Sequence, residues 1–155
     1  PLIHGGESTT IYRSGTPTVA LACSLALALD KAVTELPARV EHIRALNACL
    51  RTVLAKYPKV RINSPEGAVP HILNLSVQNV KGTVFQRELD ARGVCVSVKS
   101  ACSSDGLPSR AVFAVSHDRR NALSSWRISL SHLTTEQELN DFMQAFDACY
   151  STLTQ

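Results

Sequence analysis

Two long stretches with helical spacing, separated by a proline, restrict the fold of this chain more than any other feature. Residues 17–35 are strongly apolar, and residues 37–57 carry apolar side chains three and four positions apart. Because proline cannot continue a helix without losing a hydrogen bond, Pro37 is expected to separate two helices. The apolar positions of the second stretch, which predict one buried face, are Val40, Ile43, Leu46, Leu50, Val53 and Leu54. Together the two helices are expected to form a long helical spine.

After this spine the pattern changes to that of short strands alternating with helices. The segments that read as strands are rich in β-branched and apolar residues; they are 60–63, 71–77, 94–98 and 125–131. Helices are predicted over 82–92, over 109–115 and from residue 134 or 135 onward, where Thr135 and Glu138 form a capping-box pattern. Residues 117–121 are polar and are predicted to be a loop.

The order of these elements predicts an α+β fold with two layers. A small, mostly antiparallel sheet packed by helices on one face would bury all the apolar stripes. The length of 155 residues fits one domain with a substantial core, and 45% apolar with 19% charged residues is ordinary for a globular protein. The pattern divides the chain into a loop at 1–16, the helical spine at 17–57 and a small domain at 58–155.

Charge, hydropathy and cysteine usage exclude several classes of protein. The net charge of +3 is scattered along the chain, so neither nucleic-acid binding nor a membrane surface is indicated. The longest apolar run, 19–29, is too short to span a bilayer. Five widely spaced cysteines without a CxxC pair predict neither a disulfide framework nor a metal site, and they suit a reducing cytosol. The cysteines expected in the core are Cys23, Cys49, Cys95 and Cys149.

The remaining cysteine, Cys102, lies in the polar segment KSACSS at 99–104, directly after a predicted strand. A thiol becomes nucleophilic as the thiolate, which nearby positive charge and backbone N–H groups favour. Lys99 and the serine-rich segment offer both. The alternative, a plain exposed cysteine, fits the local composition equally well.

Two further segments are candidates for binding anions. Arg127 lies inside an apolar strand, and alternation places it on the face opposite Trp126, Ile128 and Leu130. A guanidinium there is able to hold a carboxylate through two hydrogen bonds, although a solvated strand face is a common alternative. The segment from Arg13 to Thr16 precedes a helix and would suit a phosphate. A simple helix cap is the more frequent reading of such a segment.

Three motifs occur together in order: HGG…RSGT at 4–16, KSACSS at 99–104, and SSWRISL…TTEQEL at 124–139. This combination resembles the C-terminal part of cysteine desulfurases, the NifS-like pyridoxal-phosphate (PLP) enzymes of the class V aminotransferase family. The segment HILNLSV at 71–77 is also similar to a strand of that family. The resemblance covers essentially the whole chain and implies the C-terminal domain of a fold-type I PLP enzyme.

The resemblance implies a role for four residues. Cys102 matches the nucleophile that takes sulfur from L-cysteine as a persulfide, leaving L-alanine, and passes it to an acceptor protein. Arg127 matches the arginine that binds the substrate carboxylate. Thr16 matches the threonine that reaches the cofactor phosphate of the partner subunit in a homodimer, and Arg13 belongs to the same substrate-binding site. A cytoplasmic enzyme that serves iron–sulfur cluster assembly or another sulfur pathway is implied.

The chain departs from the family pattern at several places. None of its lysines, at 31, 56, 59, 81 and 99, fits the context of the cofactor lysine, so the chain alone is expected to be inactive. The start at Pro1 likewise suggests a fragment. GGEST at 5–9 and Ser131-His132 replace a GGGQE-like run and a Gly-Arg pair. The alternatives are another class V enzyme (a selenocysteine lyase or an aminotransferase), a stand-alone sulfur-carrier domain, or a purely structural domain.

Overall fold

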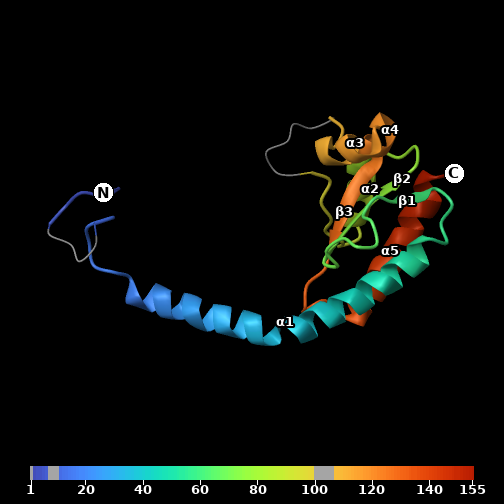
Figure 1. Ribbon diagram of the computed structural model, residues 1–155. Coiled ribbons are helices and arrows are strands. Elements are labelled where there is room, and N and C mark those ends of the chain that lie inside the picture. Colours follow the sequence, from blue (N-terminus) through green and yellow to red (C-terminus); the bar gives the residue numbers. More distant parts are fainter. Residues whose placement is uncertain (1, 7–10, 100–106) are drawn as a thin grey trace. The chain divides into compact units, whose positions relative to one another are not determined.

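The computed structural model of the chain describes residues 2–6, 11–99 and 107–155. The chain divides into two compact units, residues 1–37 and 38–155. Its helices and strands, labelled in Figure 1, follow in the order α1 (Val19–Leu54), β1 (Val60–Ile62), β2 (Ile72–Val77), α2 (Gly82–Asp90), α3 (Arg110–Ser116), α4 (Arg119–Ser124), β3 (Ser125–Ser129) and α5 (Glu136–Leu153). The combination of a small antiparallel sheet with helices confirms the predicted α+β class.

Helix α1 is one continuous helix, so the prediction that Pro37 separates two helices was wrong. Pro37 lies inside α1. A proline in a helix interior removes one hydrogen bond and costs about 3 kcal/mol relative to alanine. Helix-favouring residues, mainly alanine and leucine, surround the proline on both sides and continue the helix through this local loss. Pro37 is also the residue at which the two units divide.

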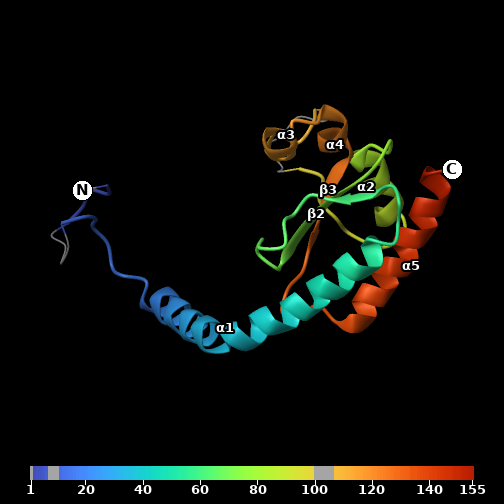
Figure 2. The same cartoon turned by 45° about the vertical axis from the view of Figure 1, so that its right-hand side comes forward.

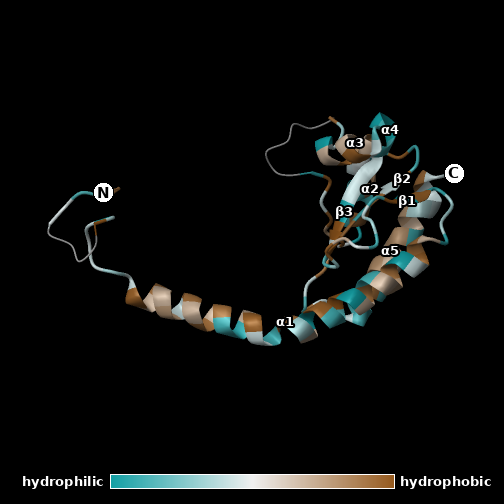
Figure 3. Cartoon of the chain, in the orientation of Figure 1, coloured by the Kyte–Doolittle hydropathy of each residue, from teal (hydrophilic) through white to brown (hydrophobic). Residues whose placement is uncertain are grey.

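The part of α1 before Pro37 belongs to the first unit and is apolar over much of its surface. Figure 3 shows this part of α1 largely in brown. Its exposed large apolar side chains are Val19, Leu21, Leu25, Leu27, Leu29, Val33 and Leu36. Cys23, predicted to lie in the core, is exposed as well. Apolar surface of this extent is typical of an interface.

The second unit is built on a three-stranded antiparallel sheet in the order β1-β2-β3. One face of the sheet is apolar because Leu73, Leu75 and Val77 alternate along β2, next to Trp126 and Ile128 on β3. The burial of Trp126 and Ile128 confirms the alternation predicted for this strand. Figure 2 shows the sheet together with α2, α5 and the C-terminal part of α1, all of which contribute side chains to the same core.

Phe146 on α5 lies at the centre of this core. Its ring is fully buried and contacts five other aromatic rings at centroid distances between 5.1 and 6.2 Å, those of Tyr57, Phe85, Trp126, Phe142 and Tyr150. Cys149, on the same helix, is buried as predicted, and burial raises the pKa of its thiol. The aromatic cluster joins α5 to α2, to β3 and to the segment that follows α1.

Helix α2 starts in close contact with β3. A Cβ atom at Gly82 would lie 2.5 Å from the carbonyl oxygen of Ser125, the first residue of β3. Real Cβ atoms essentially never come so close to another heavy atom. The absence of a side chain at Gly82 therefore allows α2 to approach the strand that carries Arg127.

Two predicted elements after α1 also differ from the structure. Residues 94–98 do not form an extended strand; only Ser97 makes a bridge, to Arg127, while the valines beside it are partly buried against the core. The polar segment 117–121, predicted as a loop, contains the start of helix α4, which Asp118 caps by accepting a hydrogen bond from the N–H of Asn121. Cys49 and Cys95, predicted to lie in the core, are exposed.

The capping box predicted at the start of α5 is confirmed. The hydroxyl of Thr135 accepts a hydrogen bond from the N–H of Glu138 at 3.1 Å, and the Glu138 carboxylate accepts one from the N–H of Thr135 at 2.8 Å. Hydrogen bonds from the backbone and the hydroxyl of Thr135 lower the pKa of Glu138. The box therefore works with the carboxylate charged.

Replacing Thr135 with alanine is expected to destabilise the chain by about 1 kcal/mol, because one N–H of the first helical turn loses its partner. Urea denaturation at pH 7, where the Glu138 carboxylate is charged, measures this difference in the free energy of unfolding. Thr152→Ala is the matched control, since the hydroxyl of Thr152 bonds only within α5, to the carbonyl of Ala148. Equal stability of the two variants would show that the Thr135 hydroxyl contributes nothing to the stability of the helix start.

Candidate functional site

The sheet face opposite the core is polar and carries the candidate site residue of the second unit. Along β2 the residues on this face are Asn74 and Ser76, and along β3 they are Ser125 and Arg127. Helix α4 lies against this face at Ser76, whose hydroxyl donates to the carbonyl of Asn121 at 3.1 Å. This face is polar because successive residues of a strand point to opposite faces, and the apolar residues of β2 and β3 occupy the core-facing positions.

Arg127 occupies the middle of a row that crosses the sheet. Asn74 is its direct partner on β2. On its other side, Ser97 exchanges two backbone hydrogen bonds with it, of 2.7 and 3.2 Å. The Nε atom of Arg127 is buried and has no hydrogen-bond partner among the residues that the structure describes. A buried charged donor without a partner is costly, so this position suits a bound anion.

A network of amides lies next to Arg127, and sequence reasoning did not identify it. The side chain of Asn63 bonds to those of Asn74 at 2.9 Å and Ser76 at 2.8 Å, and it accepts a hydrogen bond from Asn121 at 2.9 Å. They come from three separate parts of the sequence, with Asn74 and Ser76 together in the segment 71–77, and no motif spacing links the three parts. The register of β1 and β2 and the position of α4 bring them together, so only the alternation of polar residues along β2 hinted at them.

Arg13 and Thr16 belong to the first unit. The segment around Arg13 lies beside residues 2–4: Ile3 forms a parallel bridge with Arg13, and the N–H of Ser14 donates to the carbonyl of Ile3 at 3.1 Å. Gly15 has a φ of 94°, which turns the chain before the exposed Thr16 and the start of α1. Hydroxyl and guanidinium groups on one short turn suit a phosphate.

Cys102, the predicted nucleophile, lies outside the described residues. The described chain reaches Lys99 on one side and resumes at Leu107 on the other. On the first side, Ser97 is bonded to Arg127; on the second, the N–H of Ser109 donates to the carbonyl of Ala122 at 3.1 Å. Ser97 and Ser109, one on each side of Cys102 in the sequence, are therefore both hydrogen-bonded to the continuous stretch formed by α4 and β3.

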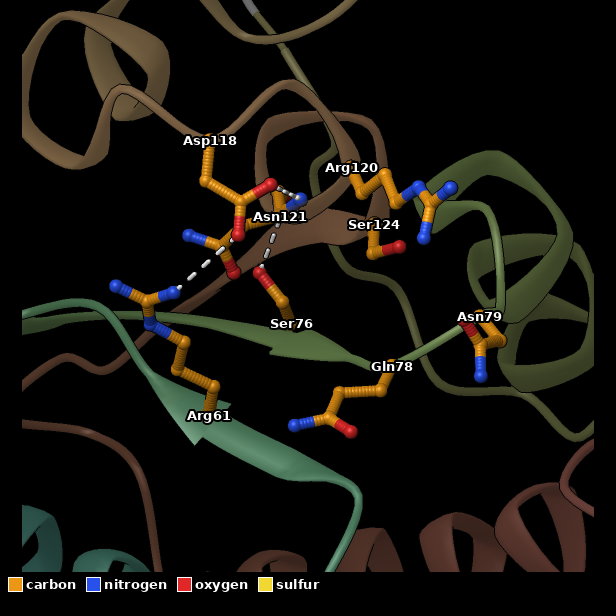
Figure 4. A pocket seen from close by; sticks show the side chains of 8 residues that line it. All are labelled: Arg61, Ser76, Gln78, Asn79, Asp118, Arg120, Asn121 and Ser124. Atoms are coloured by element: carbon orange, nitrogen blue, oxygen red, sulfur yellow. Dashed lines mark hydrogen bonds and ion pairs between the residues drawn. The ribbon is translucent and has the colours of Figure 1, made fainter.

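A polar cavity of about 190 Å³ lies beside α4; it shares Ser76 and Asn121 with the amide network and contains none of the predicted site residues (Figure 4). It is lined by Arg61 and Asp118, which form an ion pair at 3.6 Å, and by Arg120.

Within the ranges described, no three His, Cys, Asp or Glu residues form a group able to hold a metal ion. No helix in those ranges has the length and apolar character needed to cross a membrane.

Comparison with protein families gives one match over most of the chain. Residues 4–142 match the family described as aminotransferase class-V. Among curated proteins, the cysteine desulfurase IscS of Dictyoglomus turgidum is 34% identical over 143 residues, which cover 90% of this chain and 36% of that protein. The cysteine desulfurase NifS of Azotobacter vinelandii is 29% identical over 143 residues, with the same coverage of 90% and 36%.

Solved structures give the same result for the fold. A NifS-like protein is 32% identical with a TM-score of 0.81, and the match covers 99% of this chain and 39% of that one. A NifS-like protein from Rickettsia africae is 28% identical with a TM-score of 0.77, and the match covers 97% and 40%. The chain therefore spans well under half the length of the relatives it matches.

Proposed function

This chain belongs to the aminotransferase class-V family, and from this membership we propose that it is the C-terminal part of a pyridoxal-phosphate-dependent cysteine desulfurase. The intact enzyme would remove sulfur from L-cysteine, releasing L-alanine and leaving a persulfide on Cys102. Relatives named cysteine desulfurase, such as those of D. turgidum and A. vinelandii, support the reaction type.

The observation that carries this proposal is the pair of backbone hydrogen bonds between Arg127 and Ser97. They fix the backbone of Arg127, whose guanidinium is proposed to bind the substrate carboxylate, to the backbone of Ser97, two residues before KSACSS. A carboxylate held by Arg127 would place the rest of a small amino acid near this sheet edge. The residue proposed to bind the substrate and the segment proposed to transfer sulfur would then be held next to each other by the same backbone contact.

The chemistry proposed for Cys102 is a transfer of one sulfur atom. The thiolate attacks the sulfur of L-cysteine, forming an S–S bond as the C–S bond breaks. The electron pair of the broken bond goes to the substrate carbon, which takes up a proton and becomes the methyl group of L-alanine. The persulfide sulfur then passes to a thiol of an acceptor protein, which the sequence does not identify.

The residues of the first unit fit the phosphate of the cofactor. Thr16 would donate its hydroxyl to that phosphate across a homodimer, and Arg13 would line the substrate site nearby. When bound, pyridoxal phosphate supplies an electron sink for the substrate α-carbon. None of the lysines, at 31, 56, 59, 81 and 99, lies in the sequence context expected of the residue that attaches the cofactor. The chain by itself is therefore proposed to be inactive, and residues 1–16 to belong with the cofactor domain of a cytoplasmic enzyme.

The test is alanine release from L-cysteine by the full-length protein loaded with cofactor, comparing the wild type with Cys102→Ala. We expect the variant to lose at least 100-fold in rate, because without the thiolate the sulfur has no acceptor on the protein. Mass spectrometry after incubation with L-cysteine should find one additional sulfur on the peptide that contains Cys102.

Cys95→Ala is the matched control, since Cys95 is an exposed thiol close by in sequence. It should retain the rate of the wild type. Alanine release that survives Cys102→Ala would remove Cys102 from the mechanism, and a wild type without any alanine release would contradict the desulfurase itself.

A further inference from the structure

We propose that Asn74 donates a second hydrogen bond to the substrate carboxylate bound by Arg127, with its amide oriented by a hydrogen-bond network that allows only one orientation. The inference rests on the proposed function, because the carboxylate is that of L-cysteine. It adds Asn74 of β2 to the proposed substrate-binding residues and explains why Asn74 presents its NH₂ group, rather than its carbonyl oxygen, to the substrate.

The orientation of the network is fixed at its inner end by a backbone carbonyl. The carbonyl of Asn121 can only accept, so the hydroxyl of Ser76, 3.1 Å away, must donate its single proton to it. The atom of Asn63 that lies 2.8 Å from Ser76 must then be a donor, its Nδ2. Figure 4 shows the inner end of this network, where Asn121 meets Ser76 and Asp118.

The same reasoning continues outward to Asn74. The second proton of Asn63 Nδ2 points to Asn74 at 2.9 Å, so the Asn74 atom facing it must be the acceptor, Oδ1. The Oδ1 atom of Asn63 accepts from Asn121 at 2.9 Å, which agrees with this assignment. The donor and acceptor roles of the neighbouring groups thus fix the orientation of each amide. The NH₂ group of Asn74 is directed away from Asn63.

Asn74 presents this NH₂ group on the sheet face that it shares with Arg127. The two residues are direct partners in the register of β2 and β3, so their Cβ atoms are expected to lie about 5 Å apart. Asn74 is half-buried, and within the described ranges its Nδ2 donates to no protein acceptor, while its Oδ1 accepts from Asn63. Arg127 Nε, beside it, is buried without a partner in those same ranges. Two neighbouring side chains therefore hold unused donors on one face.

A carboxylate is the small anion that these donors suit. It offers about four lone-pair positions, and the planar guanidinium fork of Arg127 occupies two of them. A position facing β2 stays open for the amide of Asn74. An aspartate at 74 would keep the bond to Asn63 but would set a negative charge against the substrate, so an amide at this position favours anion binding.

The test compares Asn74→Asp with the wild type in the full-length, cofactor-loaded protein. We expect the KM for L-cysteine to rise about 10- to 100-fold, as for the loss of a hydrogen bond to a charged group, while kcat changes less than about 3-fold. Calorimetric titration with L-alanine, which carries the same carboxylate, should show a similar loss of affinity. Asn74→Leu, of similar size without a donor, should show the same split with a smaller rise in KM.

Gln78→Glu is the matched control, because it places the same added charge on an exposed residue just after β2 and outside the network. It should leave KM within about 2-fold of the wild type. A wild-type KM in Asn74→Asp, or a fall in kcat at constant KM, would overturn the role of Asn74 and leave the desulfurase standing. If the wild type releases no alanine, the proposed function fails. In that case the titration with L-alanine decides the role of Asn74: equal binding by the wild type and Asn74→Asp, or binding by neither, overturns the inference as well.

Discussion

Replacing Arg127 with lysine in the full-length protein is expected to lower kcat/KM for L-cysteine by about 10- to 100-fold, and alanine at this position by 100-fold or more. Lysine keeps the positive charge but has no planar fork, so it cannot hold a carboxylate through two parallel hydrogen bonds. Alanine removes the charge altogether, which in a partly buried site costs more. The measurement is the initial rate of alanine release over a range of L-cysteine concentrations.

Arg61→Lys is the matched control for Arg127. Arg61 lies on the same sheet face, on β1, but its charge is paired with Asp118 at 3.6 Å in an exposed position. Exposed pairs of this kind contribute little, so this variant should keep the kinetics of the wild type. If Arg127→Lys also kept the full kcat/KM, the two-bond contact with the substrate would be contradicted.

Replacing Phe146 with alanine should destabilise the chain by about 3–5 kcal/mol, because its ring is fully buried. The ring fills the middle of a cluster of aromatic side chains, and its removal leaves a cavity between α2, β3 and α5. Because a domain of this size has only about 5–15 kcal/mol of stability, the loss should be visible as a large drop in the urea midpoint.

The control for Phe146 is Leu133→Ala, at a leucine that is 74% exposed just before α5. It should change the free energy of unfolding by no more than about 0.5 kcal/mol. A loss at Phe146 close to that of the control would mean that the core collapses around the missing ring, and would contradict the central position of Phe146 in the cluster.

The strongly periodic parts of the fold were predictable from sequence. Alternation along 125–131 identified the strand and assigned Trp126 to the core, and the capping box placed the start of α5. The prediction of a helix break at Pro37 was wrong because it considered only the hydrogen bond that proline removes. The high helix propensity of the long segments on both sides of Pro37 outweighs that loss. Helix α4 was missed because a six-residue, charged segment has no apolar period; Asp118, a good N-cap residue, was the one available signal.

The site was only partly predictable for a related reason. Arg127 stood out as a charge inside an apolar strand, but Asn74 beside it looks like an ordinary polar strand residue. Its orientation depends on Asn63 and Asn121, which reach it only through the register of β1 and β2 and the position of α4. Exposure was also unpredictable for Cys23 and Cys49, because apolar residues on α1 do not by themselves show which side is covered.

The close approach at Gly82 has a consequence for the way this sequence can drift over evolutionary time. Any side chain at that position must displace the first carbonyl of β3, and β3 cannot shift without carrying Arg127 along. A mutation to alanine, usually among the mildest of changes, would therefore be selected against through the proposed substrate site at Arg127 rather than through the helix in which it occurs. Across lineages, Gly82 and Arg127 should be kept or lost together.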